Sequence, residues 1–203
     1  MFEDITFVLT GFGKFPGVEH NPAEAIATSM KKYLADHESK LSIETMPVAI
    51  DAKSMRLAIL ELVQKPKVLE ANRVVFLHLG TLLESGFKIE KRAFNWAVDV
   101  PGAAAPGVVV KDMPKQGVLD TSLDVEALVS KMNGRSATVA SYDAGRYVIN
   151  YLYYFSLFQV GADFENSTSL FLNVPTFANV PQERQMDYVK TLMETISEEL
   201  QKE

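Results

Sequence analysis

The stretch that decides the fold is Ser141–Phe158, SYDAGRYVINYLYYFSLF. The residues that lead into it, 138–142, are β-prone and mostly apolar, which predicts the end of a strand. Asp143–Gly145 then predicts a tight turn, with a carboxylate able to cap the amides that follow. From Arg146 onward the residues are apolar almost all round, and a helix without a polar stripe belongs in the interior. The sequence therefore predicts a strand, a tight turn and a buried helix.

A junction of this kind is a candidate functional site in α/β proteins. Backbone amides and the helix dipole favour negative charge at a helix N-terminus. A cysteine in the first turn would have its pKa lowered and become a nucleophile. The chain contains no cysteine at all, which excludes thiol catalysis, disulfides and thiolate metal sites.

The segment 144–154, AGRYVINYLYY, resembles the active-site motif of the pyroglutamyl peptidase I (pyrrolidone-carboxylate peptidase) family. In that family the nucleophilic cysteine stands immediately before the asparagine, so its place is held here by Ile149. An apolar, β-branched side chain cannot be activated as a nucleophile. Arg146 stands where the family has a small residue, and we expect its long cation to fill or recharge the mouth of the pocket.

The first loop adds to this resemblance. Thr10-Gly11-Phe12 is followed by Phe15, Gly17 and then Asn21-Pro22, at the spacing of the signature that opens these peptidases. The resemblance implies that Phe12 and Phe15 wall a pocket around a pyroglutamyl ring. The alternative is that the two phenylalanines pack beneath the loop, and the sequence leaves both interpretations open.

A glycine-ended strand at 79–80 and the segment 89–95, IEKRAFN, resemble two further family motifs. Glu90 matches the acid that orients the catalytic histidine, a role in which a carboxylate fixes the tautomer of the imidazole. Thr81 falls where the family has a residue that contacts the lactam of the ligand. The resemblance therefore implies a ligand-binding Thr81 and a vestigial catalytic Glu90.

The segment 170–175, LFLNVP, resembles the family motif that carries the catalytic histidine, and Asn173 occupies the histidine position. An amide has no useful basicity near neutral pH, so it cannot act as a general base or acid. Without an imidazole beside it, we expect Glu90 to pair with a nearby cation, for which the candidates are Lys91, Arg92 and Arg146.

The three histidines do not replace the missing one. His20, His37 and His78 lie far in sequence from the motifs of the second half, and we expect neutral core or surface roles for them. Their spacing does not match a zinc site. The first loop also lacks a glycine spacing that cradles phosphate. We therefore expect no metal and no cofactor.

Strand-like and helix-like segments alternate along the chain. We expect strands at 5–9, 41–50, 73–79, 138–142 and 169–174, with an extended segment at 90–98. We expect helices at 22–37 and 51–64, then one capped by Asp120 or Thr121 and running through Met132, then one from Arg146 and one from about Pro181. Residues 99–117 are rich in Pro, Gly and Ala, and are expected to form an ordered excursion over a site or an interface. The order predicts one three-layer α/β/α domain, residues 1–203, with a mainly parallel twisted sheet.

Composition narrows the function classes. The formal net charge of −6, without a basic run, argues against a nucleic-acid partner. No apolar run approaches the ~18 residues that a membrane span needs. The first residues, MFED, lack the pattern of a signal peptide, and we expect a cytoplasmic protein.

The sequence thus predicts a catalytically inactive homologue of pyroglutamyl peptidase I. It is expected to keep the fold and a pocket for a small peptide or pyroglutamyl-like ligand, or an assembly role, and the resemblance implies a homo-oligomer. Two alternatives stay open, namely an active hydrolase with a rearranged site and a regulatory or scaffold subunit of a catalytic homologue. Fold alone does not decide between them.

Overall fold

The computed structural model describes residues 5–14, 20–104, 106–163 and 166–202. Its centre is a six-stranded sheet in the order β2-β1-β3-β8-β4-β7. All neighbouring strands in it are parallel except β4 and β8, which are antiparallel. The strands are β1 (Ile5–Phe12), β2 (Ser42–Val48), β3 (Arg73–Thr81), β4 (Phe87–Glu90), β7 (Thr138–Ser141) and β8 (Ser167–Val174). The predicted α/β fold with a mainly parallel sheet is confirmed.

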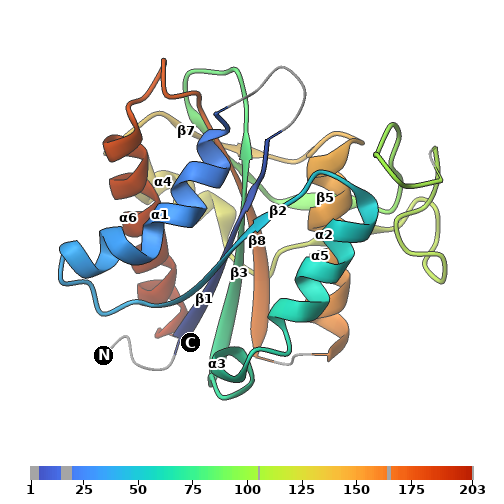
Figure 1. Cartoon of the computed structure of the whole chain (residues 1–203), viewed down its shortest axis with the longest axis horizontal. Helices are drawn as coiled ribbons and strands as arrows, with labels where there is room; N and C mark the ends of the chain where they lie inside the picture. Colours follow the sequence, from blue (N-terminus) through green and yellow to red (C-terminus); the bar gives the residue numbers. More distant parts are fainter. Residues whose placement is uncertain (1–4, 15–19, 105, 164–165, 203) are drawn as a thin grey trace.

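Helices cover both faces of the sheet, as Figure 1 shows. One face carries α1 (Pro22–Asp36), α4 (Val125–Met132) and α6 (Gln182–Leu200), whose apolar residues share a core cluster with the sheet. The other face carries α2 (Ala52–Leu62), the short α3 (Pro66–Leu69) and α5 (Val148–Asp163). Within the described ranges, no helix is both long enough and apolar enough to cross a membrane.

The expected starts of α1, α2 and α6 match the structure, and that of α4 is wrong. Asn21 caps α1 by accepting a hydrogen bond from the amide of Ala23 at 3.1 Å. Asp51 caps α2 in the same way. The cap of α4 is Asp124, which accepts from the amide of Ala127, rather than Asp120 or Thr121. Asp120 instead ends a strand, and this strand pairing is a non-local contact that local sequence does not reveal.

Helix α5 begins two residues later than expected. Gly145 has a φ of 76°, a left-handed conformation that glycine adopts without strain, and this keeps Arg146 outside the helix. Asp143 does not cap α5, because its carboxylate accepts from the amide of Gly145 at 2.9 Å and closes the turn. From Tyr151 to Leu157 every residue is buried, so the expectation of an interior helix is confirmed.

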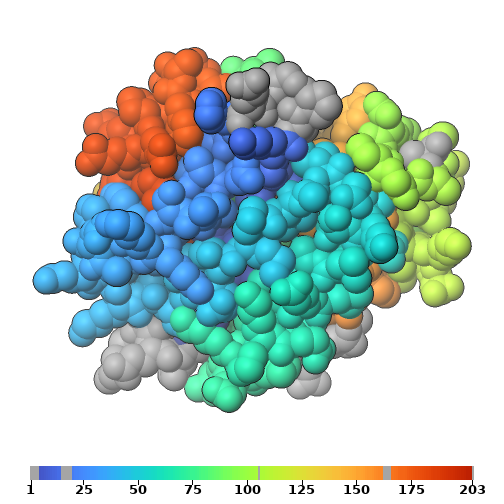
Figure 2. Space-filling view, viewed as in Figure 1, coloured from blue at the N-terminus to red at the C-terminus, as the bar shows by residue number. Residues whose placement is uncertain are grey.

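The excursion after β4 is built on a small second sheet of β5 (Arg92–Phe94) and β6 (Val118–Asp120). The buried Asn95 orders the residues between these strands. Its side-chain amide donates to the carbonyls of Val110, Met113 and Pro114, all at 3.0 Å, and its oxygen accepts from the amide of Val110. In Figure 2 the yellow-green part of this excursion forms a projection beside α2. The excursion is ordered over its described residues, as predicted. Strand β5 lies within the segment that was expected to be extended, whereas β6 was not expected.

Candidate functional site

A cleft of about 450 Å³ opens at the carboxyl ends of β1 and β3, next to the start of α5. In parallel α/β sheets this edge is the usual place for ligand sites. Its volume falls in the range typical of small-molecule pockets. It is lined by Phe12, Lys14, Asn21, Ile50, Thr81, Asp99, Pro101, Tyr147, Val148 and Ile149.

Three of the residues singled out by sequence meet in this cleft. Phe12 reaches it from the end of β1, Thr81 from the end of β3, and Ile149 from the first turn of α5. Phe15 lies outside the described residues. Arg146 is not among the residues that line the cleft, since its guanidinium lies 3.6 Å from the ring centre of Phe94 and 2.5 Å from Asp143.

Asn21 lines the cleft, although the sequence pointed to it only as part of the signature in the first loop and not as a site residue. Its side-chain oxygen accepts from the hydroxyl of Thr81 at 2.7 Å, and its amide donates to the carbonyl of Gly13 at 2.9 Å. Asn21 therefore ties the first loop, the start of α1 and the end of β3 together. The tight Asn-Pro start of α1 was the sequence signal that pointed to this position.

Glu90 and Asn173 form a buried pair behind the cleft. The amide of Asn173 donates to Oε1 of Glu90 at 2.7 Å, and the two side chains are 2 % and 1 % exposed. Glu90 Oε2 and Asn173 Oδ1 are buried without a hydrogen-bond partner among the described residues. Burial raises the pKa of the Glu90 carboxyl, although the hydroxyl of Ser141, the charge of Lys88 and the bond from Asn173 act in the opposite direction. Neither residue lines the cleft.

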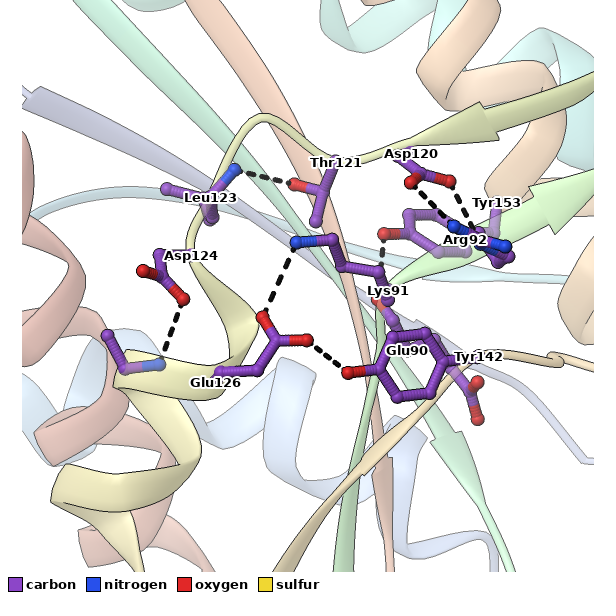
Figure 3. Close-up of polar contacts among 11 residues, drawn as sticks. Glu90, Lys91, Arg92, Asp120, Thr121, Leu123, Asp124, Glu126, Tyr142 and Tyr153 are labelled. Carbon is purple, nitrogen blue, oxygen red and sulfur yellow. Dashed lines mark hydrogen bonds and ion pairs between the residues drawn. The ribbon is translucent and has the colours of Figure 1, made fainter.

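The expectation that a cation would pair with Glu90 is wrong. Figure 3 shows Lys91 directed at Glu126 and Arg92 directed at Asp120, with Nζ–O and Nη2–O distances of 3.5 and 3.0 Å. Arg146 pairs with Asp143 instead. The side chains of Lys91 and Arg92 are 22 % and 36 % exposed, so their charges stay hydrated next to solvent-exposed carboxylates. Pairing with Glu90 would require burying a cation, and the free-energy cost of removing that charge from water is large. An exposed pair avoids this cost, although it contributes little stability.

Gly80 makes room for the pair. A Cβ at this position would lie 2.8 Å from the ring of Phe171 and 3.0 Å from Oδ1 of Asn173. Such contacts are closer than packed atoms tolerate, so any side chain at position 80 would displace Asn173 or Phe171. The glycine at the end of β3 is thus required by the close approach of β8.

Asn150, next to Ile149, holds the start of α5 against β5. Its oxygen accepts from the amide of Phe94 at 2.7 Å, and its nitrogen donates to the carbonyls of Phe94 and Trp96 at 2.9 and 3.0 Å. The side chain is fully buried. Because buried amides are stable only when their hydrogen bonds are made, these contacts fix the position of Ile149 in the cleft wall.

A serine and a histidine do meet, but away from the cleft. His78 Nε2 lies 2.8 Å from the hydroxyl of Ser156, and its Nδ1 lies 2.7 Å from the hydroxyl of Thr10. All three residues are fully buried, and burial lowers the pKa of His78 to about 3. A base of this strength is far from the operating pH of a general base, and the pair lacks access to a substrate. The neutral core role expected for His78 agrees with this geometry.

The other two histidines are exposed. His37 stacks on Tyr33, with ring centres 4.0 Å apart, and His20 lines a separate hollow with Phe177. Within the described ranges, no group of three His, Asp or Glu side chains is arranged to hold a metal ion. The cleft offers apolar walls, hydroxyls and one charge of each sign.

Several solved structures of peptidases resemble this chain in fold. A mutant pyrrolidone carboxyl peptidase from the hyperthermophile Pyrococcus furiosus superposes with a TM-score of 0.81 at 21% identity, covering 97% of this chain and 99% of that one. The pyrrolidone carboxyl peptidase of Fervidobacterium islandicum AW-1 gives 0.78 at 22% identity, covering 96% and 99%. Pyroglutamyl peptidase I of Bacillus amyloliquefaciens gives 0.78 at 18% identity, covering 94% and 95%. Neither the family models nor the curated proteins give a match.

These likenesses cover nearly the whole chain in both directions, so the fold is that of the pyroglutamyl peptidases. At these identities they establish the fold alone, because one fold hosts many functions.

Proposed function

We propose that this chain is a non-catalytic protein with the pyroglutamyl peptidase fold that binds a small peptide-like ligand in the cleft beside α5. The proposal combines the inherited shape of the cleft with the chemistry of the residues that now line it. Phe12 and Thr81 supply an apolar wall and a hydroxyl at the carboxyl edge of the sheet. The first turn of α5 supplies Ile149 where the resembling family has a nucleophile.

The observation that carries the proposal is the Glu90–Asn173 pair. In a working peptidase of this type, the acid orients a histidine that takes a proton from the nucleophile. Here the acid accepts a hydrogen bond from an amide at 2.7 Å, and both side chains are buried and do not line the cleft. An amide cannot move a proton near neutral pH, so we infer that the pair performs no proton transfer.

The direct test is hydrolysis of a fluorogenic pyroglutamyl amide by the purified protein. We expect no turnover above the rate of buffer alone. An active pyroglutamyl peptidase, assayed in parallel, controls for the reporter. Turnover that survives repurification and grows with protein concentration would contradict the proposal and favour an active hydrolase with a rearranged site.

Assembly is the second candidate function, and it is favoured by apolar residues exposed on α2. Leu57 and Leu60 are 52 % and 42 % exposed there. A homo-oligomer, or a complex with a catalytic homologue, would cover them. Multi-angle light scattering of the purified chain measures the first possibility, and a Leu57→Ser, Leu60→Ser variant that leaves the mass unchanged would remove α2 from the interface.

A further inference from the structure

The cleft has two charged residues that come from different loops. Lys14 follows β1, and Asp99 follows β5 and begins the excursion. Both side chains are exposed, and neither has an ion pair with another residue that the structure describes. Among the residues that the structure describes, the cleft therefore presents one charge of each sign that has no ion-pair partner.

Asp99 stands on a backbone that is fixed and strained. Its φ is 50°, in the left-handed region that costs a residue with a Cβ about 1–2 kcal/mol. The residues around it are anchored, since the amide of Val98 donates to the carbonyl of Arg146 at 2.6 Å and the carbonyl of Pro101 accepts from Ala52 at 2.8 Å. Val100 is buried. The carboxylate is thus presented to the cleft from a position that the surrounding structure holds in place.

Much of the rest of the cleft lining is apolar. Phe12 is almost fully buried, and Ile50, Val148 and Ile149 are half-buried around the hollow. Apolar walls with a few placed polar groups are typical of sites that fix the orientation of a small ligand. An occupant that matches this cleft carries an apolar body, one cation and one anion.

We propose that the cleft binds a short apolar peptide with free termini, with its ammonium group at Asp99 and its carboxylate at Lys14. This inference rests on the proposed binding function and names its ligand class. A peptide blocked by pyroglutamate has no ammonium group and leaves Asp99 without a counter-charge. The cleft therefore selects free over blocked N-termini, the reverse of what a pyroglutamyl peptidase requires.

The test is isothermal titration calorimetry with four probes, namely Leu-Leu, N-acetyl-Leu-Leu, Leu-Leu amide and pyroglutamyl-leucine. We expect Leu-Leu to bind most tightly. Loss of either terminal charge weakens binding about 3- to 10-fold, the size of a hydrogen-bonded ion pair that solvent still reaches. If N-acetyl-Leu-Leu or pyroglutamyl-leucine binds as tightly as Leu-Leu, the role of Asp99 is wrong. Binding of none of the four overturns the inference altogether.

Two variants test which cleft residue binds each terminal charge of the peptide. Asp99→Asn keeps the shape and suits the left-handed backbone, and is expected to abolish the preference for Leu-Leu over its N-acetyl form. Lys14→Gln is expected to abolish the preference for the free acid over the amide. Asp112→Asn and Lys111→Gln, exposed positions of the excursion that do not line the cleft, are matched controls and are expected to keep both preferences. Variants that leave both preferences intact would contradict the assignment.

The two experiments test the proposed function and this inference separately. The fluorogenic assay decides whether the chain is catalytic, and the calorimetry decides which peptides it binds. Hydrolysis with the expected charge preferences would overturn the first proposal and keep the second. No hydrolysis, combined with tighter binding of pyroglutamyl-leucine than of Leu-Leu, would keep the proposal of a non-catalytic binding protein. It would overturn the inference that the cleft prefers free termini.

Discussion

The two faces of the central sheet differ in what they bury. On the face covered by α1, α4 and α6, the inward side chains of the four central strands are mostly apolar, with Thr168 of β8 as a buried polar exception. The apolar ones are Ile5, Phe7, Leu9, Val75, Leu77, Leu79, Phe87, Ile89, Leu170, Leu172 and Val174. On the face covered by α2 and α5, the same strands also bury Thr10, His78, Glu90, Ser169 and Asn173. The second face thus mixes polar groups with apolar side chains such as Val8, Phe76 and Phe171, whereas the first is almost wholly apolar.

This difference shows which face of the sheet depends on particular pairs of residues. The apolar face gains its stability from buried area, which tolerates exchange between side chains of similar volume. The polar face depends on individual partners, such as Ser156, which bridges His78 and Ser169 at 2.8 and 2.9 Å. Since a buried polar group without a partner is costly, each substitution there must be matched by another. The cleft is built at the edge of this second face.

The largest expected effect converts the buried pair on the polar face into a working dyad. We expect Ile149→Cys combined with Asn173→His to hydrolyse the fluorogenic pyroglutamyl amide ~10²–10⁴-fold faster than Ile149→Cys alone, because general acid–base catalysis is worth that much. Glu90 already lies within hydrogen-bond distance of position 173. The measurement is initial rate per folded enzyme.

Two controls accompany this comparison. Ile149→Cys with Asn173→Gln adds side-chain length without basicity and is expected to match the single variant. Arg146→Thr, added to the double variant, removes the cation nearest the start of α5. If the folded triple variant shows no burst of product, then the cleft differs from a working peptidase site at more than positions 146, 149 and 173.

The second prediction compares neighbours on β3 that face opposite ways. Leu77→Ala, on the apolar face, is expected to lower the free energy of unfolding by ~2–5 kcal/mol because it leaves a cavity. His78→Leu, on the polar face, is expected to lower it by ~1–3 kcal/mol because Thr10 loses its partner and Ser156 keeps only Ser169. Urea denaturation followed by circular dichroism measures both.

A compensating change at Thr10 tests whether the stability lost in His78→Leu comes from the hydroxyl that is left without a partner. Adding Thr10→Val to His78→Leu removes the orphaned hydroxyl, and replacing both partners by apolar groups is close to neutral. The double variant is therefore expected to recover part of the lost stability. A further loss would mean that the polar chain through His78 does not act as a unit.

Much of the fold was readable from local pattern. The apolar run at 5–9, the Asn-Pro start of α1 and the apolar surface of α5 each predicted an element that the structure contains. The antiparallel pairing of β4 with β8 and the small sheet of β5 and β6 were missed, because strand partners far apart in sequence leave no local signal. The late start of α5 depends on the left-handed Gly145, one residue among several plausible turn positions.

The site was predictable in part. Phe12, Thr81 and Ile149 were each placed by motif spacing, and they do meet in one cleft. The partner of Glu90 was predicted wrongly because sequence distance favoured the adjacent cations, whereas alternation along β4 and β8 brings Glu90 and Asn173 to the same face. Lys14 and Asp99 went unnoticed as cleft residues, because a single charge in a loop carries no pattern until the fold gives it a neighbour.

The smallest expected effect concerns the carboxyl of Glu90, the one acid among the polar groups that the second face buries on the central strands. Burial raises its pKa above the usual value of 4.5, with the charge of Asp143 adding to this and that of Lys88 opposing it. Between 4.5 and its folded-state pKa, the native protein keeps a proton that the unfolded chain releases, so raising the pH favours unfolding. Below pH 4.5 the contribution is constant.

We therefore expect the difference in free energy of unfolding between Glu90→Gln and the unaltered protein to grow as the pH rises from 4.5, with a slope of at most about 1.4 kcal/mol per pH unit for one proton. The glutamine keeps an acceptor for Asn173 and cannot ionise. Urea denaturation in steps from pH 4 to pH 8 measures this difference. Glu198→Gln, an exposed carboxylate on α6, is the control and is expected to give no such rise. A difference that stays flat for Glu90→Gln would show that the carboxyl ionises as freely in the fold as in the unfolded chain, and that Ser141, Lys88 and Asn173 together offset its burial.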